Sequence, residues 1–140
     1  MVNKDVVKLL GKVPLFSGAS RAQIEAAGQA FKDVEHDAGD VLAREGQSGV
    51  GFFVISEGTA DVSVGGRVRA SLGPGDLFGE ISLLDDGPRT ATVTATSAVR
   101  ALGITAWTFR GLLRDHPGLA LSVLEVMAAR LRSATDELSA

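Results

Sequence analysis

The 140-residue chain contains no cysteine, no tyrosine and only two histidines. Without cysteine there can be no disulfide bond, no thiol catalysis and no thiolate metal site. The histidines, His36 and His116, are far apart in the sequence and show no His-x-His spacing of metal ligands. No serine lies in a nucleophile-elbow pattern. We therefore expect no metal site and no enzymatic activity.

The chain also lacks an excess of positive charge and a long apolar run. Its 14 Lys and Arg residues against 17 Asp and Glu residues give a net charge of −3, unlike the basic balance of most nucleic-acid binders. A single bound phosphodiester needs only one or two donors, so a small anionic ligand is compatible with this charge. No segment approaches the roughly 18 apolar residues of a membrane span, and the opening MVNKDVVKLLGK lacks the features of a signal peptide. We predict a cytoplasmic protein that binds neither nucleic acid nor membrane directly.

Hydrophobic residues make up 45% of the chain, which is enough for the core of a single domain spanning 1–140. Residues 5–10 and 21–29 read as helices, the second capped by Ser20, with Val13–Phe16 as an extended segment between them. Residues 105–115 and 119–138 read as a C-terminal helix pair. Short strands separated by glycine turns are predicted at 31–36, 41–44, 52–55, 60–64, 68–72, 90–96 and 99–104.

Gly65-Gly66 is a two-residue hairpin signal, and Gly73-Pro74-Gly75-Asp76 is expected to close the same hairpin. Many short strands with glycine-rich turns indicate an antiparallel barrel or sandwich. The predicted fold class is α+β, an antiparallel β-roll (jelly-roll-like) barrel at 31–104. N-terminal helices at 1–30 precede it, and the C-terminal helix pair at 105–140 follows.

The segment 78–93, FGEISLLDDGPRTATV, does not fit a plain array of hairpins. Residues 79–84 look like one helical turn, whose first N–H groups have no partner inside the helix and suit a phosphate. Gly79 would let the backbone approach a ligand closely. The carboxylate of Glu80 can accept hydrogen bonds from a hydroxyl pair, and Arg89 offers a planar fork of donors for a phosphate oxygen. Together these features describe a nucleotide site.

The same segment resembles the phosphate-binding cassette of the cyclic-nucleotide-binding domain family. That family includes the sensor domains of catabolite activator protein, of the regulatory subunit of protein kinase A and of cyclic-nucleotide-gated channels. Phe-Gly-Glu, Pro-Arg and Ala-Thr-Val stand in the family's register. The resemblance extends to the segment VPLFSGAS and to the turn glycines Gly39, Gly46, Gly58 and Gly75.

The resemblance implies a role for each cassette residue. Glu80 would accept from the ribose 2′-hydroxyl, and Arg89 would pair with the cyclic phosphate. Gly79, Ser82 and Thr90 would approach through backbone N–H groups, although many members have alanine in place of Ser82. Thr90 permits cGMP without requiring it, and cAMP is the favoured ligand; no cofactor is expected. The implied ligand-binding set is Gly79, Glu80, Ile81, Ser82, Arg89, Thr90 and Ala91.

The last predicted helix carries an apolar stripe with the 3-4-3-4 spacing of a coiled-coil seam, formed by Leu124, Met127, Leu131, Ala134 and Leu138. This stripe predicts either a homodimer, as in related activators, or packing of the helix on its own β-roll. The resemblance also implies that this helix can cover the purine as a lid, with Met127, Arg130 and Leu131 as candidates.

The function predicted from the sequence is a non-catalytic module that binds a cyclic nucleotide and switches its C-terminal helices. Two alternatives remain open. The chain can be a ligand-free β-roll that mediates protein interaction or dimerisation. It can also be the sensor fragment of a larger transcription regulator or another effector. A β-barrel enzyme of the cupin kind would need clustered histidines, which this sequence does not have.

Overall fold

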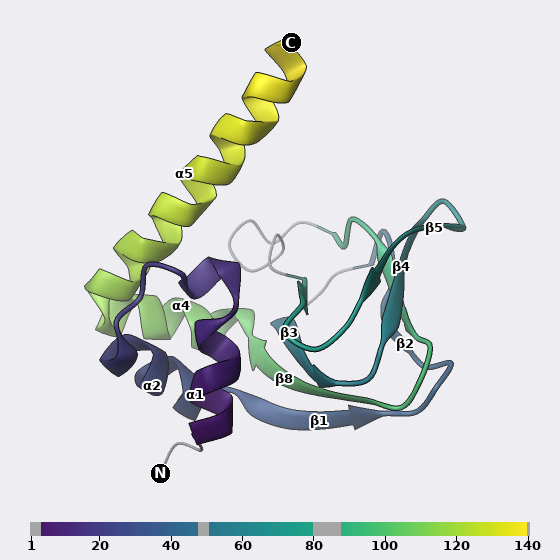
Figure 1. The fold of residues 1–140 in the computed structure, drawn as a ribbon, viewed down its shortest axis with the longest axis horizontal. Coiled ribbons are helices and arrows are strands. Elements are labelled where there is room, and N and C mark those ends of the chain that lie inside the picture. The colour runs from purple at the N-terminus through teal and green to yellow at the C-terminus, as the bar shows by residue number, and fades with distance from the viewer. Residues whose placement is uncertain (1–3, 48–50, 80–87, 140) are drawn as a thin grey trace. The chain divides into compact units, whose positions relative to one another are not determined.

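The computed structural model describes residues 4–47, 51–79 and 88–139, which form two compact units. One unit comprises residues 30–110, and the other comprises residues 1–29 together with 111–140. Figure 1 shows that the first consists mainly of strands and the second of helices. The candidate cassette lies in the strand-rich unit.

The strand-rich unit contains two four-stranded sheets in which every described pairing is antiparallel. One sheet has the order β1-β8-β3-β6 and the other the order β2-β7-β4-β5. This arrangement confirms the predicted α+β fold with a β-roll (Figure 1). The strands are β1 (Lys32–His36), β2 (Val41–Ala43), β3 (Gly51–Glu57), β4 (Ala60–Val64), β5 (Arg67–Leu72), β6 (Leu77–Phe78), β7 (Thr92–Ala95) and β8 (Val99–Thr105).

The core of the roll is built from alternate residues of these strands, because successive side chains of a strand point to opposite faces. Its buried members come from both sheets, and the rings of Phe53 and Phe78 stack at its edge with centroids 5.2 Å apart. The buried members are Ala43, Ile55, Ala60, Phe78, Val93, Ala95, Val99 and Ala101.

The turns around β5 confirm one prediction and correct another. Gly65 and Gly66 have φ angles of 59° and 80°, as a two-residue hairpin between β4 and β5 requires. The sequence suggested that the turn at 73–76 closes the same hairpin, but in the structure it does not. It carries the chain into β6 of the other sheet, where the Gly75 N–H donates to the Ile55 carbonyl over 2.8 Å.

The helical elements are α1 (Lys4–Gly11), η1 (Pro14–Phe16), α2 (Arg21–Ala30), α4 (Ala106–Asp115) and α5 (Pro117–Ser139). Ser20 caps α2 as predicted: its Oγ accepts from the Gln23 N–H over 3.2 Å, and Gln23 Oε1 accepts from the Ser20 N–H over 2.9 Å. The prediction of an extended 13–16 segment is wrong beyond Val13. Pro14 opens a 3-10 turn there, because its fixed φ suits a helix start.

Helix α5 contacts η1, and the Ser122 hydroxyl donates to the Gly18 carbonyl over 3.0 Å. Leu119 and Val123 on α5 are buried. A second set of apolar side chains on α5, Leu121, Leu124 and Leu131, is 59%, 62% and 69% exposed. Leu124 and Leu131 of the predicted seam are thus on the surface, whereas the Leu138 side chain lies outside the described residues. No helix within the described residues is both long and apolar enough to span a membrane.

Candidate functional site

Arg89 is the one charged residue that is buried among those the structure describes, with 8% of its surface exposed. Its guanidinium donates from Nη2 to the Gly51 carbonyl of β3 over 2.7 Å. Burial of a cation is costly unless hydrogen bonds or an anion compensate for the lost water. The chain therefore maintains a desolvated positive charge inside the roll, which is the environment in which a bound anion interacts most strongly.

The backbone of Arg89 is held by the turn that follows β2. The Arg89 N–H donates to the Gln47 carbonyl, and the Gly46 N–H donates to the Arg89 carbonyl, both over 2.8 Å. This reciprocal pair holds the backbone from which the Arg89 side chain extends. The turn glycine at 46 has a φ of 80°, a left-handed conformation that glycine adopts at no steric cost.

Gly79 lies directly after β6 and against the Arg89 side chain. Its φ is 89°, and a Cβ at this position would lie 2.8 Å from the Gly51 carbonyl oxygen and too close to Arg89 Nη1. The lack of a side chain at Gly79 thus makes room for the guanidinium beside the backbone of β3. The sequence analysis predicted that Gly79 lets the backbone approach a ligand closely, and that contact stays a prediction. The groups that lie close to Gly79 in the structure are the Arg89 side chain and the Gly51 carbonyl.

Arg89 lines two cavities of the strand-rich unit. The smaller has a volume of about 160 Å³, and cassette residues form one of its walls. Strands β2, β4, β5, β6 and β7 supply the rest. Its described lining is Ala43, Val62, Leu72, Leu77, Phe78, Gly79, Arg89, Thr90, Ala91 and Val93.

The larger cavity has a volume of about 620 Å³ and is lined by β1, β2, β3, β8 and the start of α4. It shares only Ala43 and Arg89 with the described lining of the smaller cavity. Phe53 lines the larger cavity and stacks on Phe78, which lines the smaller one. The two cavities therefore adjoin at Arg89, at Ala43 and at this ring pair.

The structure brings together four of the residues predicted to bind ligand, namely Gly79, Arg89, Thr90 and Ala91. The other three, Glu80, Ile81 and Ser82, lie outside the described residues. The candidate lid residues Met127, Arg130 and Leu131 are on α5 in the helical unit.

Sequence reasoning missed the apolar part of the small cavity, to which β2, β4, β5 and β7 contribute Ala43, Val62, Leu72 and Val93. The alternation in Ala60–Val64 identifies Val62 as one of a set that shares a face, but not as part of a cavity wall. Within the described part of the chain, no group of three or more His, Cys, Asp or Glu side chains is arranged to hold a metal ion.

A family model described as "Cyclic nucleotide-binding domain" matches residues 33–116. The chain is 30% identical over 139 residues to the "CRP-like cAMP-activated global transcriptional regulator" of Mycobacterium tuberculosis, covering 94% of this chain and 61% of that protein. It is 34% identical over 110 residues to the "cAMP-dependent protein kinase regulatory subunit" of Hypocrea atroviridis, covering 79% of this chain and 24% of that protein.

Among solved structures, the N-terminal domain of a transcriptional regulator from Streptomyces coelicolor superposes with a TM-score of 0.84 at 34% identity, covering 93% of this chain and 94% of that one. The catabolite activator protein of Thermus thermophilus gives a TM-score of 0.77 at 32% identity, covering 90% and 62%. The chain thus spans 61% of the length of the matched Mycobacterium tuberculosis regulator.

Proposed function

Because the chain belongs to the cyclic nucleotide-binding domain family, we propose that it binds a cyclic nucleotide inside the β-roll and acts as a regulatory module without catalysis. The observation that carries this proposal is the buried Arg89, which lies against Gly79 and lines a cavity together with Thr90 and Ala91. The relatives named above are regulators rather than catalysts by their descriptions, which supports the same proposal.

The Arg89 guanidinium is the group proposed to bind the cyclic phosphate. A phosphate oxygen would form charge-assisted hydrogen bonds with it in which both partners are ionised, whereas the Gly51 carbonyl that Arg89 contacts in the structure is neutral. The small cavity, at about 160 Å³, lies below the roughly 300–1,000 Å³ of usual ligand pockets. We therefore expect the described lining to enclose only part of the nucleotide, with the phosphate at Arg89.

Glu80 and Thr90 are proposed to read the sugar and the base. Glu80 would accept a hydrogen bond from the ribose 2′-hydroxyl. Thr90, which is exposed and lines the small cavity, offers a hydroxyl that can contact the 2-amino group of guanine. We propose cAMP as the preferred ligand and cGMP as the competitor. The descriptions of the Mycobacterium tuberculosis regulator and of the Hypocrea atroviridis regulatory subunit both name cAMP.

Calorimetric titration of ligand-stripped protein with cAMP and then with cGMP tests this proposal. We expect saturable binding of one nucleotide per chain, with cAMP bound more tightly. In Glu80→Ala, affinity for cAMP should fall more than affinity for 2′-deoxy-cAMP. Equal losses for the two ligands would contradict the ribose role. A folded protein that binds neither nucleotide would instead support a ligand-free interaction module.

We further propose that nucleotide binding repositions the C-terminal helices and that an effector reads this movement; the named regulators are described as cAMP-activated or cAMP-dependent, which supports a regulatory output. A ligand shifts such an equilibrium only if it binds one state better than the other. Because the chain has no cysteine, spin labels can be attached at introduced cysteines alone. In the spin-labelled variant Arg69→Cys/Ala128→Cys, double electron–electron resonance should show that the distribution of distances between the two labels changes on addition of cAMP. An unchanged distribution at saturating cAMP would contradict the switch.

Dimerisation through α5 is a further proposal, supported by the exposed Leu121, Leu124 and Leu131. Three exposed leucines within one helix favour an apolar seam between two copies. Sedimentation velocity should show a dimer whose dissociation constant rises at least tenfold in Leu131→Glu. Ser133→Glu, which adds the same charge two residues away, is the control. A monomeric wild-type protein would contradict this seam.

A further inference from the structure

The larger cavity is a second candidate site. Its described lining differs from that of the smaller cavity at every residue except Ala43 and Arg89. Its volume of about 620 Å³ is well within the range of small-molecule pockets. We propose that this cavity binds a small organic anion, a carboxylate or sulfonate carried on an aromatic or branched apolar body. This proposal does not depend on nucleotide binding at the smaller cavity.

The charge of the cavity supports an anionic ligand. Lys32, Arg44 and Arg89 all line it, whereas none of its described lining residues is acidic. This local balance is opposite to that of the whole chain, which carries a net charge of −3. Arg89 is buried and the other two cations are exposed. An anion can therefore be drawn in by, and paired with, the exposed Lys32 and Arg44, while Arg89 remains the group proposed for the nucleotide phosphate.

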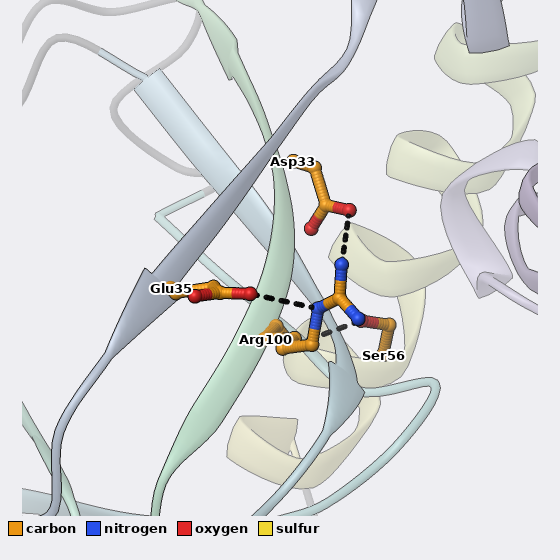
Figure 2. Close-up of polar contacts among 4 residues, drawn as sticks. All are labelled: Asp33, Glu35, Ser56 and Arg100. Atoms are coloured by element: carbon orange, nitrogen blue, oxygen red, sulfur yellow. Dashed lines mark hydrogen bonds and ion pairs between the residues drawn. The ribbon is translucent and has the colours of Figure 1, made fainter.

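The acidic residues that neighbour Lys32 and Arg44 in the sequence make their contacts elsewhere. Asp33 and Glu35 alternate with Lys32 along β1, so they point to the opposite face of the sheet. Figure 2 shows both carboxylates reaching Arg100 of β8, at 2.9 Å from Nη2 and 3.4 Å from Nε respectively. Glu45, next to Arg44, accepts a hydrogen bond from the Gly65 N–H over 3.0 Å. Asp33, Glu35 and Glu45 thus have hydrogen-bond or ion-pair partners other than Lys32 and Arg44.

The walls of the cavity suit an apolar body. Val34, Phe53 and Ile104 contribute hydrophobic surface, and Trp107 of α4 lines the cavity with 64% of its surface exposed. Gly103 of β8 helps to form the space, since a Cβ there would lie 2.6 Å from the Phe53 ring. An aromatic ligand can stack on such rings while its acidic group faces the cations.

Trp107 is the only tryptophan of the chain, and there is no tyrosine, so the fluorescence and the single indole N–H resonance come from this one lining residue. The probe is 8-anilinonaphthalene-1-sulfonate, an aromatic sulfonate. Titration should quench Trp107 by energy transfer, with one probe per chain, and should shift the indole resonance. The charge-reversal variant Lys32→Glu/Arg44→Glu should bind the probe at least tenfold more weakly. The cavity-filling variant Val34→Phe should also bind it more weakly.

Lys8→Glu/Lys12→Glu is the matched control, since it makes the same two charge reversals in and just after α1 and should leave probe binding unchanged. Three outcomes would overturn the proposal: no change at Trp107 in the folded protein, equal losses in the charge-reversal and control variants, or complete displacement of the probe by cAMP. Calorimetry of the same variants with cAMP distinguishes this proposal from the nucleotide site. The Lys32, Arg44 and Val34 variants are expected to bind cAMP within about threefold of wild type.

Discussion

The two cavities beside Arg89 are bounded by the same pair of sheets, yet they differ in size and in charge. The described lining of the smaller contains several cassette residues and one cation, whereas the described lining of the larger contains three cations and, of the cassette, Arg89 alone. The comparison shows that a motif can identify one wall of a site without revealing the space next to it. Arg89 lines both cavities, so a change at Arg89 can affect binding in each.

The largest effect is expected from Arg89→Ala. Loss of a charge-assisted bond to phosphate should cost about 1.5–3 kcal/mol, or about 10- to 150-fold in affinity for the cyclic nucleotide. Arg100→Ala is the matched control, because Arg100 is half-exposed and pairs with Asp33 and Glu35. Calorimetry should show unchanged nucleotide binding in that variant. Similar losses in both would mean that Arg89 has no special role.

Gly79→Ala tests whether space beside Arg89 is required. Both Gly79 and Gly75 have φ near 90°, so alanine is strained at either position. Only at Gly79 would the added Cβ also collide with Arg89, since nothing lies within 4 Å of the corresponding position at Gly75. Urea denaturation should show a loss in the free energy of unfolding that is about 1–3 kcal/mol greater for Gly79→Ala than for Gly75→Ala. Equal losses would contradict the crowding.

Thr90→Ala sharpens the assignment of the base. If its hydroxyl binds guanine, affinity for cGMP should fall by the value of one hydrogen bond, about 0.5–1.5 kcal/mol, while affinity for cAMP changes little. Thr94→Ala, on β7 and outside both described linings, is the control. Competition binding with both nucleotides measures the ratio. A ratio that stays constant in Thr90→Ala would remove Thr90 from base selection.

The smallest effect is expected from Phe53→Leu, which breaks the ring stack between the cavities. A pair formed by the Phe53 ring and the naphthalene ring of the probe would contribute about 0.5–1.5 kcal/mol beyond its buried area. Affinity for the probe should therefore fall a fewfold, while cAMP binding is retained. Phe52→Leu is the comparison, because Phe52 is fully buried against Phe31 and Phe109 and lines neither cavity. Unequal effects of Phe53→Leu on the two ligands would agree with two separate sites, and equal losses would not.

The sequence predicted much of this fold, because local patterns dictate it. Gly65-Gly66 and the Ser20 cap depend on residues close in the chain, and both are seen in the structure. Strand β6 was not predicted, since two residues between turns carry no alternation. The 3-10 turn after Val13 was also missed, because an apolar Pro-Leu-Phe run is compatible with either conformation.

Two residues of the candidate site, Gly79 and Arg89, could be predicted from the sequence. Glycine marks a position of backbone freedom, and arginine supplies a positive charge for a phosphate. The larger cavity could not be predicted, because it depends on tertiary arrangement. Lys32 and Arg44 are ordinary exposed residues in the sequence, and only pairing of β1 with β8 and of β2 with β7 places them around one space. The conformation at Glu80, Ile81 and Ser82 lies outside the described residues, so their predicted roles stay predictions.

The most direct measurement is a nitrogen-15 NMR titration of the ligand-stripped protein with cAMP. It follows the backbone amides of Gly79, Thr90 and Ala91 together with the indole N–H of Trp107. We expect saturable shifts at the three amides and little change at the indole, because the phosphate would bind on the cassette side of Arg89. Shifts confined to the indole, with the three amides unchanged, would place the nucleotide in the larger cavity and contradict the proposed site.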